Sequence, residues 1–378
     1  MFACIVPAVL TIMFVLVQTP SPDFVVLDGA GFRLAAFPVG VLTSAEAAVR
    51  QLRPVAFEVP GLPKEAHVIL ANGDRVCGRV VGGDARQIVF KTPFGESESS
   101  IPLSRIAAVW WSEPPAELPA DPARYPLLAG PKLDSILLAD RDVRGGLIER
   151  VTNQAVVFVQ NNKTESIAVE QVRAVVFDPA LLRERKPTGT MIKVTLGDGS
   201  RLTFGELTSD GKTLIGKTTW GATLTIRVSE VRLLERVGIP DAEPKVLLPT
   251  MEPYNGDGLR PCLNHTTAGR LLKLPGYGVV DRGAVLPAGS DLVFKLGGKF
   301  RKFYATIGLE SGTHGSATFQ LLLDGKELQA DANPLLPGVV VPLTIDVSAA
   351  AELRLSIRRG PLGNFQSRVV LAAPCGIR

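Results

Sequence analysis

Three stretches of the chain repeat one pattern: HVILANGDRVCGRVV at residues 67–81, DSILLADRDVRGGLI at residues 134–148 and IKVTLGDGSRLTFGEL at residues 192–207. Each begins with an alternating apolar strand, makes a turn rich in Asp, Asn and Gly, and then resumes the alternation. Asn-Gly or Asp-Gly between two alternating runs is a strong signal for a β-hairpin. Each stretch therefore predicts a hairpin, and its repetition decides the fold.

Each hairpin opens a longer segment that ends on a strand rich in Val and Ile, such as IPLSRIAAVWW at residues 101–111. The alternating runs in between predict about five short strands per segment, which form a small, bent antiparallel module. The three modules span 66–112, 133–180 and 190–237, and in pattern they resemble Sm-like or SH3-like small barrels. Residues 23–62 contain another Asp-Gly turn and predict a degenerate further module.

Proline-rich stretches separate these parts. Residues 113–132 contain six prolines and predict an extended linker, and residues 238–251 predict a second one. The remaining segment, 252–378, predicts an antiparallel β-sandwich from its own alternation. Its strands are expected at 291–296, 303–309, 317–323, 339–347 and 353–357. The fold class is therefore all-β, with tandem barrel-like modules followed by a sandwich.

The composition excludes several classes of protein. With 46% apolar and 21% charged residues, the 378-residue chain is not disordered. A net charge of +4 without a basic stripe of interleaved aromatics disfavours nucleic-acid binding. His67, His265 and His314 lie far apart, and no nucleophile elbow or metal-ligand spacing occurs. The sequence predicts no catalytic residues, no metal site and no cofactor.

One motif formally matches a phosphate-binding loop: GKTLIGKT at residues 211–218. A real phosphate-binding loop leads from a strand into a helix, whose amide groups hold the phosphates. Here the following residues alternate and are β-branched, which predicts a strand. We therefore expect no nucleotide to bind at this motif.

The N-terminus and the cysteines bear on the compartment. Residues 2–17 (FACIVPAVLTIMFVLV) are almost wholly apolar, so residues 1–22 predict a signal peptide or an N-terminal anchor of a secreted, periplasmic or cell-surface protein. Cys262 and Cys375 lie near the two ends of the C-terminal segment. They are expected to form a disulfide if the ends of the sandwich meet, whereas the alternative is that all cysteines are reduced and buried. Cys77 is expected to be a buried thiol.

The C-terminal segment resembles the NPCBM family, which are carbohydrate-binding modules attached to glycosyl hydrolases. The matching blocks are RLLKL at 270–274 with Tyr277 and Arg282-Gly283, DLVFKLGGKFRKFYATIGLE at 291–310, GSATFQLLLDGKEL at 315–328 and PLTIDVSAAAELRLSI at 342–357. The resemblance covers about a third of the chain. It implies a jelly-roll of the galactose-binding type, association with polysaccharides, and no catalysis by this domain.

The sequence departs from the family pattern where a sugar would bind. Pro287 stands at the position of the family's histidine, and the closing stretch FQSRVVLAAPCGIR lacks the family's Asp and Trp. Sugar recognition needs an aromatic face and polar groups that bind hydroxyls. The remaining candidates are Tyr254, Tyr277, Arg282 and Asn364. The alternative is that the tyrosines pack at a sandwich edge and that Asn364 lies in a turn.

These observations predict a non-catalytic, exported bacterial protein that binds a polysaccharide or glycan through its C-terminal segment. A different reading is a structural or assembly protein, whose β-modules bind protein partners through exposed strand edges while the sandwich serves as a scaffold. A third is an accessory subunit of a glycosidase.

Overall fold

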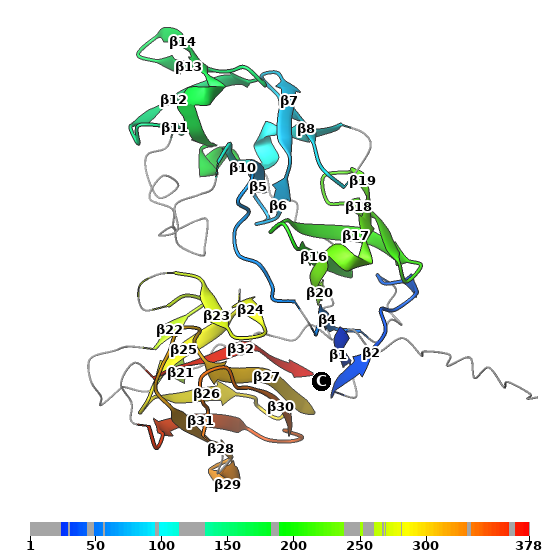
Figure 1. Cartoon of the computed structure of the whole chain (residues 1–378), viewed down its shortest axis with the longest axis vertical. Helices are drawn as coiled ribbons and strands as arrows, with labels where there is room; N and C mark the ends of the chain where they lie inside the picture. Colours follow the sequence, from blue (N-terminus) through cyan, green and yellow to red (C-terminus); the bar gives the residue numbers. More distant parts are fainter. Residues whose placement is uncertain are drawn as a thin grey trace, which may run out of the picture.

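The computed structural model is built almost wholly of antiparallel strands, which confirms the predicted all-β fold (Figure 1). It describes residues 24–28, 31–43, 49–55, 57–94, 98–112, 133–182, 189–237, 250–251, 261–266, 268, 270–280, 282–330, 334–362 and 367–377. The predicted signal peptide or anchor at 1–22 and the linker at 113–132 lie outside these residues, as does most of the linker at 238–251. Nowhere in the described ranges does a helix have the length and apolar character needed to cross a membrane.

Each of the three predicted hairpins is present and opens a module of the same design. Module 1 consists of β5 (His67–Leu70), β6 (Arg75–Cys77), β7 (Arg79–Gly83), β8 (Gln87–Lys91), β9 (Ser99–Pro102), the short helix η1 (Leu103–Arg105) and β10 (Ile106–Trp110). Module 2 consists of β11 (Asp134–Leu138), β12 (Val143–Val151), β13 (Ala155–Gln160), β14 (Lys163–Ala168), η3 (Val169–Gln171) and β15 (Val172–Val176).

Module 3 follows the same order, and a reduced module precedes module 1. Module 3 consists of β16 (Met191–Leu196), β17 (Arg201–Ser209), β18 (Thr213–Thr218), β19 (Thr223–Arg227), η5 (Val228–Glu230) and β20 (Val231–Val237). The N-terminal module consists of β1 (Phe24–Asp28), β2 (Gly31–Ala35), β3 (Gly40–Val41) and β4 (Gln51–Pro54). The phosphate-loop-like residues 211–218 form a turn and strand β18, as their alternation predicted.

The modules join edge to edge in one continuous sheet. Its main order is β12-β11-β15-β10-β5-β6-β17-β16-β20-β4-β1-β2, with every pairing antiparallel. The last strands of modules 1 and 2 pair at Val109↔Val175. Likewise, the last strands of module 3 and the N-terminal module pair at Leu234↔Leu52. Buried apolar side chains of all four modules form a single cluster.

The prediction that each module is barrel-like is wrong in one respect, because the strands do not close a barrel. Among the described pairings, the strands that directly precede the short helices, β9, β14 and β19, each pair with only one neighbour. A closed barrel needs both edges of its sheet to pair. Here the free edge of each last strand pairs with the last strand of another module instead.

The C-terminal sandwich has two five-stranded antiparallel sheets. One sheet has the order β21 (Thr250–Met251), β26 (Asp291–Lys295), β31 (Glu352–Arg359), β28 (Ala317–Leu323) and β29 (Lys326–Ala330). The other has the order β22 (Cys262–Leu263), β25 (Gly283–Pro287), β32 (Arg368–Ile377), β27 (Lys302–Leu309) and β30 (Val340–Asp346). A small hairpin, β23 (Leu272–Leu274) and β24 (Gly278–Val280), lies beside them. The five predicted strands match β26, β27, β28, β30 and β31 to within two residues at each end.

The sandwich has its own core between the two sheets, in which the rings of Phe294 and Phe303 lie 4.9 Å apart. No disulfide joins Cys262 and Cys375, so the predicted pairing is wrong. Cys262 pairs with Val285 on β25, whereas Cys375 pairs with Tyr304 on β27, at the other end of β32. A disulfide requires Cα atoms within about 7 Å, and strands that are not neighbours lie further apart than that.

Candidate functional site at the junction of the modules and the sandwich

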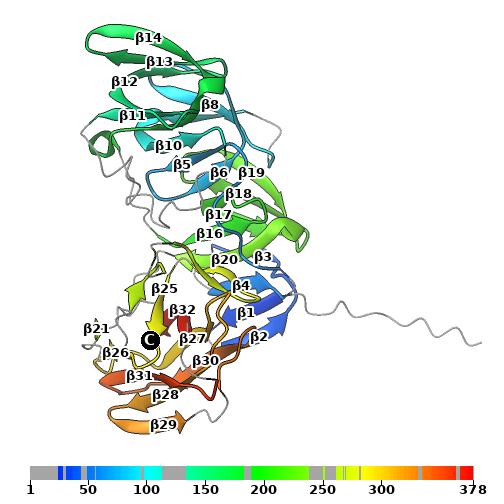
Figure 2. The ribbon, with the colours of Figure 1, turned by 60° about the vertical axis from the view of Figure 1, so that its left-hand side comes forward.

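The structure brings two of the four predicted site residues together. Tyr277 lies in the turn of the β23–β24 hairpin, and Arg282 directly precedes β25. Tyr277 contacts the N-terminal module, whose strands β1 and β2 lie beside the sandwich in Figure 2, and Arg282 contacts module 3. Tyr254 and Asn364 lie outside the described residues.

The hairpin meets the modules through main-chain hydrogen bonds. The Val59 amide donates to the Tyr277 carbonyl at 2.8 Å, and the Val279 amide donates to the Val59 carbonyl at 2.8 Å. Gly278 lies between them with a φ of +89°, and a Cβ at this position would overlap the Val59 backbone. Glycine is required there, because no other residue allows both the φ and the close approach.

The Tyr277 side chain is enclosed by the N-terminal module. It is only 3% exposed, its hydroxyl accepts a hydrogen bond from Gln51 Nε2 at 3.3 Å, and the Arg53 guanidinium lies 5.1 Å from the ring centroid. Burial lowers the pKa of Arg53, while the charge interaction with Tyr277 acts in the opposite direction. The ring therefore serves as a cation–π partner in this arrangement, and a sugar stacking on that face would displace Arg53.

Arg282 forms an ion pair with module 3. Its Nη2 lies 3.2 Å from Glu235 Oε1, and this carboxylate raises the pKa of Arg282. The pair borders a cavity of about 30 Å³, named here the junction pocket. Its lining comprises Leu27, Arg50, Gln51, Glu235, Arg236, Arg282, Ala373, Pro374 and Cys375.

The junction pocket is small, and both charged and apolar side chains line it. Its volume accommodates about two water molecules, which is too little for a pyranose ring. Leu286 does not fill it, because Leu286 is buried in the sandwich core. Burial raises the pKa of the Cys375 thiol to about 12, so the pocket holds no thiolate at neutral pH. The arrangement fixes the sandwich against the modules.

Sequence reasoning missed the residues of the modules that complete this junction. Val59, Gln51 and Arg53 lie more than 200 positions before their partners, and no local pattern connects such distant segments. Gly278 within the sequence Tyr277-Gly278 was the one available signal, since a glycine after an aromatic residue favours a turn or a close backbone approach. Among the described residues, no group of three or more His, Cys, Asp or Glu is arranged to hold a metal ion.

Comparison with known protein families identifies the C-terminal segment. Residues 248–374 match the NPCBM/NEW2 domain. This match confirms the resemblance predicted for the sandwich and covers about a third of the chain. None of the comparisons supports the predicted resemblance of the three modules to Sm-like or SH3-like barrels. A comparison with curated proteins finds no significant match.

Solved structures give weaker similarities. A CBM51 module of Clostridium perfringens GH95 in complex with methyl-galactose has 16% sequence identity, covers 33% of this chain and 90% of its own, and has a TM-score of 0.29. The tandem CBM51 modules of Sp3GH98 from Streptococcus pneumoniae have 11% identity, cover 64% of this chain and 87% of their own, and have a TM-score of 0.27. Similarities at this level do not identify a ligand for this chain.

Proposed function

We propose that this protein is a non-catalytic carbohydrate-binding protein that holds a polysaccharide or glycan at the cell surface or in the periplasm through its NPCBM domain. The observation that carries the proposal is the match of residues 248–374 to the NPCBM/NEW2 domain. The junction adds a structural reason, because a sandwich held by main-chain hydrogen bonds and an ion pair presents a bound glycan in a fixed direction.

The predicted ligand residues divide into two groups under this proposal. Tyr277 is buried beneath Arg53, so it positions the hairpin. The Arg282 side chain is 38% exposed and retains donors for a sugar hydroxyl beside its pair with Glu235. Tyr254 supplies the aromatic face on which a sugar ring stacks. Asn364 supplies a side-chain amide whose donor and acceptor each form a hydrogen bond with a sugar hydroxyl.

The proposal is tested by retention of the full chain on insoluble polysaccharides and by binding to a glycan array. The wild type is expected to be retained. Tyr254→Ala is expected to weaken binding about two- to thirteenfold, because stacking on an aromatic ring contributes roughly 0.5–1.5 kcal/mol. Asn364→Ala is expected to weaken binding by a similar factor, since it removes a bidentate hydrogen bond.

A matched control is Leu328→Ala, which changes an exposed residue on the sandwich strand β29 and is expected to leave retention unchanged. No retention of the wild type on any polysaccharide or arrayed glycan would remove the main support for carbohydrate binding. Equal weakening by Leu328→Ala would show that the effect is not specific to Tyr254.

A second function is favoured by the module array. Each module uses the edges of its strands to pair with a neighbour, and this edge pairing is the chemistry by which strands bind other proteins. We therefore also propose that the array binds a protein partner, independently of any glycan on the NPCBM domain.

A further inference from the structure

Three of the strand pairings between modules join equivalent strands, whereas the pairing of β3 with β17 does not. The last strands of modules 1 and 2 pair antiparallel, as do those of module 3 and the N-terminal module. The second strands of modules 1 and 3, β6 and β17, meet at Arg75↔Arg201. In each of these three contacts, an approximate two-fold axis between the paired residues relates one module to the other. Each edge therefore pairs with the equivalent edge of another module.

The contact between β6 and β17 has reciprocal hydrogen bonds across its axis. The Cys77 amide donates to Ser200 Oγ at 3.0 Å, and the Thr203 amide donates to Asp74 Oδ2 at 2.9 Å. Asp74 and Ser200 are the first residues after the turn of their hairpins, and Cys77 and Thr203 follow three positions later. A polar side chain after the turn therefore binds the outward amide of the opposite hairpin.

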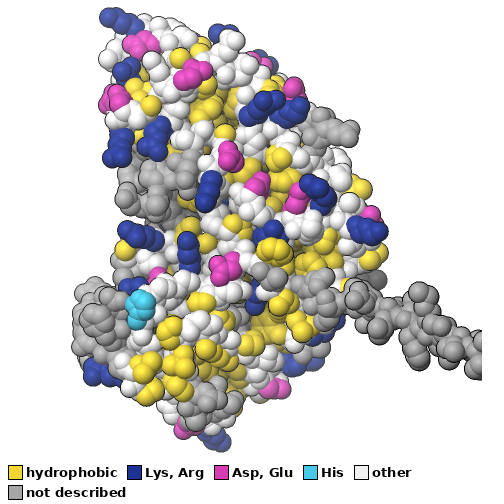
Figure 3. All heavy atoms as spheres, viewed as in Figure 1, with side chains coloured by type: hydrophobic (Ala, Val, Ile, Leu, Met, Phe, Trp, Pro, Cys, Tyr) yellow, Lys and Arg dark blue, Asp and Glu magenta, His cyan; other side chains and the backbone are white. Residues whose placement is uncertain are grey.

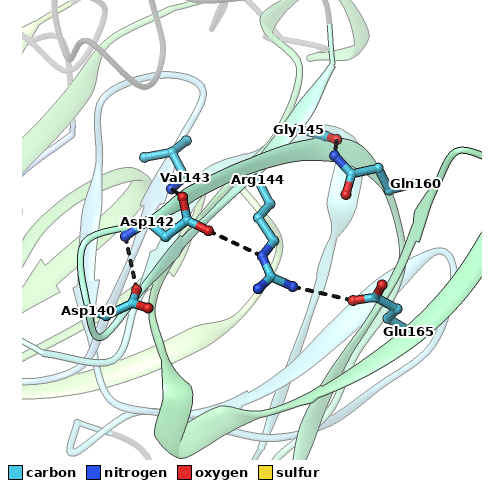
Figure 4. Close-up of polar contacts among 7 residues, drawn as sticks. All are labelled: Asp140, Asp142, Val143, Arg144, Gly145, Gln160 and Glu165. Carbon is cyan, nitrogen blue, oxygen red and sulfur yellow. Dashed lines mark hydrogen bonds and ion pairs between the residues drawn. The ribbon is translucent and has the colours of Figure 1, made fainter.

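Module 2 has the same parts at the same positions. In each hairpin, the last leucine of the first strand donates to the carbonyl of the first residue after the turn: Leu70 to Asp74, Leu138 to Asp142 and Leu196 to Ser200. This bond aligns the three hairpins. Asp142 is then equivalent to Asp74 and Ser200 and supplies the polar side chain, and Gly145 is equivalent to Cys77 and Thr203 and supplies the outward amide. Val143 stands where the other two hairpins have Arg75 and Arg201 (Figure 4).

This edge of module 2 is exposed. Because hydrogen-bonded positions alternate along an antiparallel strand, the amides of Val143 and Gly145 point away from β11. The side chains of Val143 and Leu147 are 48% and 53% exposed, and a Cβ built at Gly145 meets nothing within 4 Å. Strand β12 also lies at the end of the array opposite the sandwich (Figure 2). At the other end the second strand β2 is covered, since Phe32 packs against Tyr304 of the sandwich.

We propose that β12 pairs with β12 of a second copy of this chain, across a two-fold axis at Val143. The pairing continues the sheet by the rule that already joins β6 to β17, with Asp142 of each copy accepting from the Gly145 amide of the other. An exact two-fold axis places the same residue on both sides. The contact between β6 and β17 places Arg75 opposite Arg201, whereas two copies of Val143 would bury apolar surface without bringing like charges together.

The contacts that compete with this pairing are weak. Asp142 accepts from its own Val143 amide at 3.0 Å and lies 3.4 Å from Arg144 Nε, while Arg144 Nη1 lies 3.3 Å from Glu165 (Figure 4). These groups are largely exposed, and exposed ion pairs contribute little. Arg144 does, however, replace the buried Val76 and Leu202 of the other hairpins, so the paired surface is smaller. The dimer is therefore expected to be weak and reversible.

Sedimentation velocity of the full chain over a dilution series tests the pairing. The wild type is expected to pass from dimer to monomer on dilution. Gly145→Pro removes the outward amide, and proline is tolerated where an edge-strand amide faces solvent, so the fold is kept. This variant is expected to dissociate at a concentration at least tenfold higher. Its polysaccharide retention stays at the wild-type level, because the NPCBM domain lies at the other end of the array.

A cysteine crosslink locates the axis. Val143→Cys is expected to form a disulfide-linked dimer under mild oxidation, because residues paired across an antiparallel contact have Cα atoms about 5.5 Å apart. Ile215→Cys, at a 50% exposed apolar position on β18, is the matched control and is expected not to crosslink. The wild type, oxidised in parallel, controls for the native cysteines. A wild type that stays monomeric at 100 μM, or a dimer that withstands Gly145→Pro and does not crosslink through Cys at 143, would overturn the proposal.

Discussion

Gly278 shows how one residue fixes the contact between the sandwich and the modules. With a φ of +89° and the Val59 backbone against its Cα, it has no room for a side chain. Gly278→Ala is expected to lower the free energy of unfolding by about 2–4 kcal/mol, because it combines backbone strain with a main-chain clash. Urea unfolding measures this change, and limited proteolysis is expected to cut the β23–β24 hairpin faster.

The matched control for that change is Gly276→Ala in the same turn. Gly276 also has a positive φ, of +66°, but a Cβ there meets nothing within 4 Å. Only the conformational cost of about 1 kcal/mol is expected. Equal losses for the two variants would show that the close approach of Val59 does not matter.

His67 makes the stability of module 1 depend on pH. Its Nδ1 lies 2.8 Å from the Glu65 carbonyl, which can only accept, so Nδ1 carries the proton of the neutral ring. Burial lowers the pKa of His67 to about 4, below the ordinary 6.5 of the unfolded chain. Below pH 6.5 the unfolded state takes up this proton first, so stability falls from pH 6.5 down to about pH 4.

His67→Asn keeps a donor near Nδ1 and removes the titration. Between pH 7.5 and 4.5 the wild type is expected to lose about 2.5 kcal/mol more than the variant, as the difference in pKa requires. Urea unfolding at both pH values gives the two losses, and comparison with the variant removes the effects of Asp74 and Asp134, whose pKa values burial raises. Identical losses would mean that His67 is protonated in the folded state.

Each of modules 1, 2 and 3 packs a phenylalanine ring against a glycine, and in module 3 the two residues occupy each other's positions. This packing explains why a glycine, Gly216, stands within the phosphate-loop-like motif. In module 1 Gly78, between β6 and β7, packs against Phe90 on β8, and in module 2 Gly146 on β12 packs against Phe158 on β13. In module 3 the phenylalanine, Phe204, is on the second strand, and a Cβ at Gly216 would lie 2.7 Å from its ring. Gly216 is thus required for packing. The sequence predicted strand β18, but the packing role depends on a contact that only the fold reveals.

At the scale of strands and turns, the contact between modules 1 and 3 depends on turn residues. Ser200 is fully buried and accepts from the Cys77 amide. Ser200→Ala leaves this amide buried without a partner and is expected to cost about 1–3 kcal/mol in the free energy of unfolding. Ser166→Ala, on the exposed strand β14, is expected to cost less than about 0.5 kcal/mol. A negligible effect of Ser200→Ala would show that the amide finds another acceptor.

The positions of the strands could be predicted from the sequence, but the pairing of strands from different modules could not. Alternation and turn chemistry placed the hairpins and five sandwich strands, because both are local properties of the sequence. Which edges pair is decided by long-range contacts, so the pairing of β10 with β15 left no local signal. The same limit applied to Cys262 and Cys375, whose separation depends on the strand order of the sheet. At the site, sequence patterns selected Tyr277 and Arg282 but not the residues of the modules that contact them.

Figure 3 shows basic and acidic side chains interspersed over one face of the whole molecule, with hydrophobic side chains gathered over the sandwich. The electrostatic part of the contact between the sandwich and the modules therefore depends on individual ion pairs and not on large surfaces of opposite charge. The Arg282–Glu235 pair is such a connection, since Glu235 is 9% exposed and lies on the last strand of module 3. Whether Arg282 connects the two parts or binds a sugar is open to a direct test.

Arg282→Gln is expected to remove the ion-pair partner of the buried Glu235 and to leave it only the charge of Lys193 on β16, at a cost of about 1–3 kcal/mol. Calorimetry is expected to show the sandwich unfolding separately from the modules, and the double variant with Glu235→Gln is expected to recover part of the loss. Arg358→Gln, whose pair with Asp291 lies within the sandwich at 3.7 Å, is the matched control and should not separate the transitions. If Arg282→Gln instead unfolds like the wild type and loses polysaccharide retention, Arg282 is a sugar ligand, and the connection rests on the remaining contacts, among them those of Val59 with the β23–β24 hairpin and of Phe32 with Tyr304.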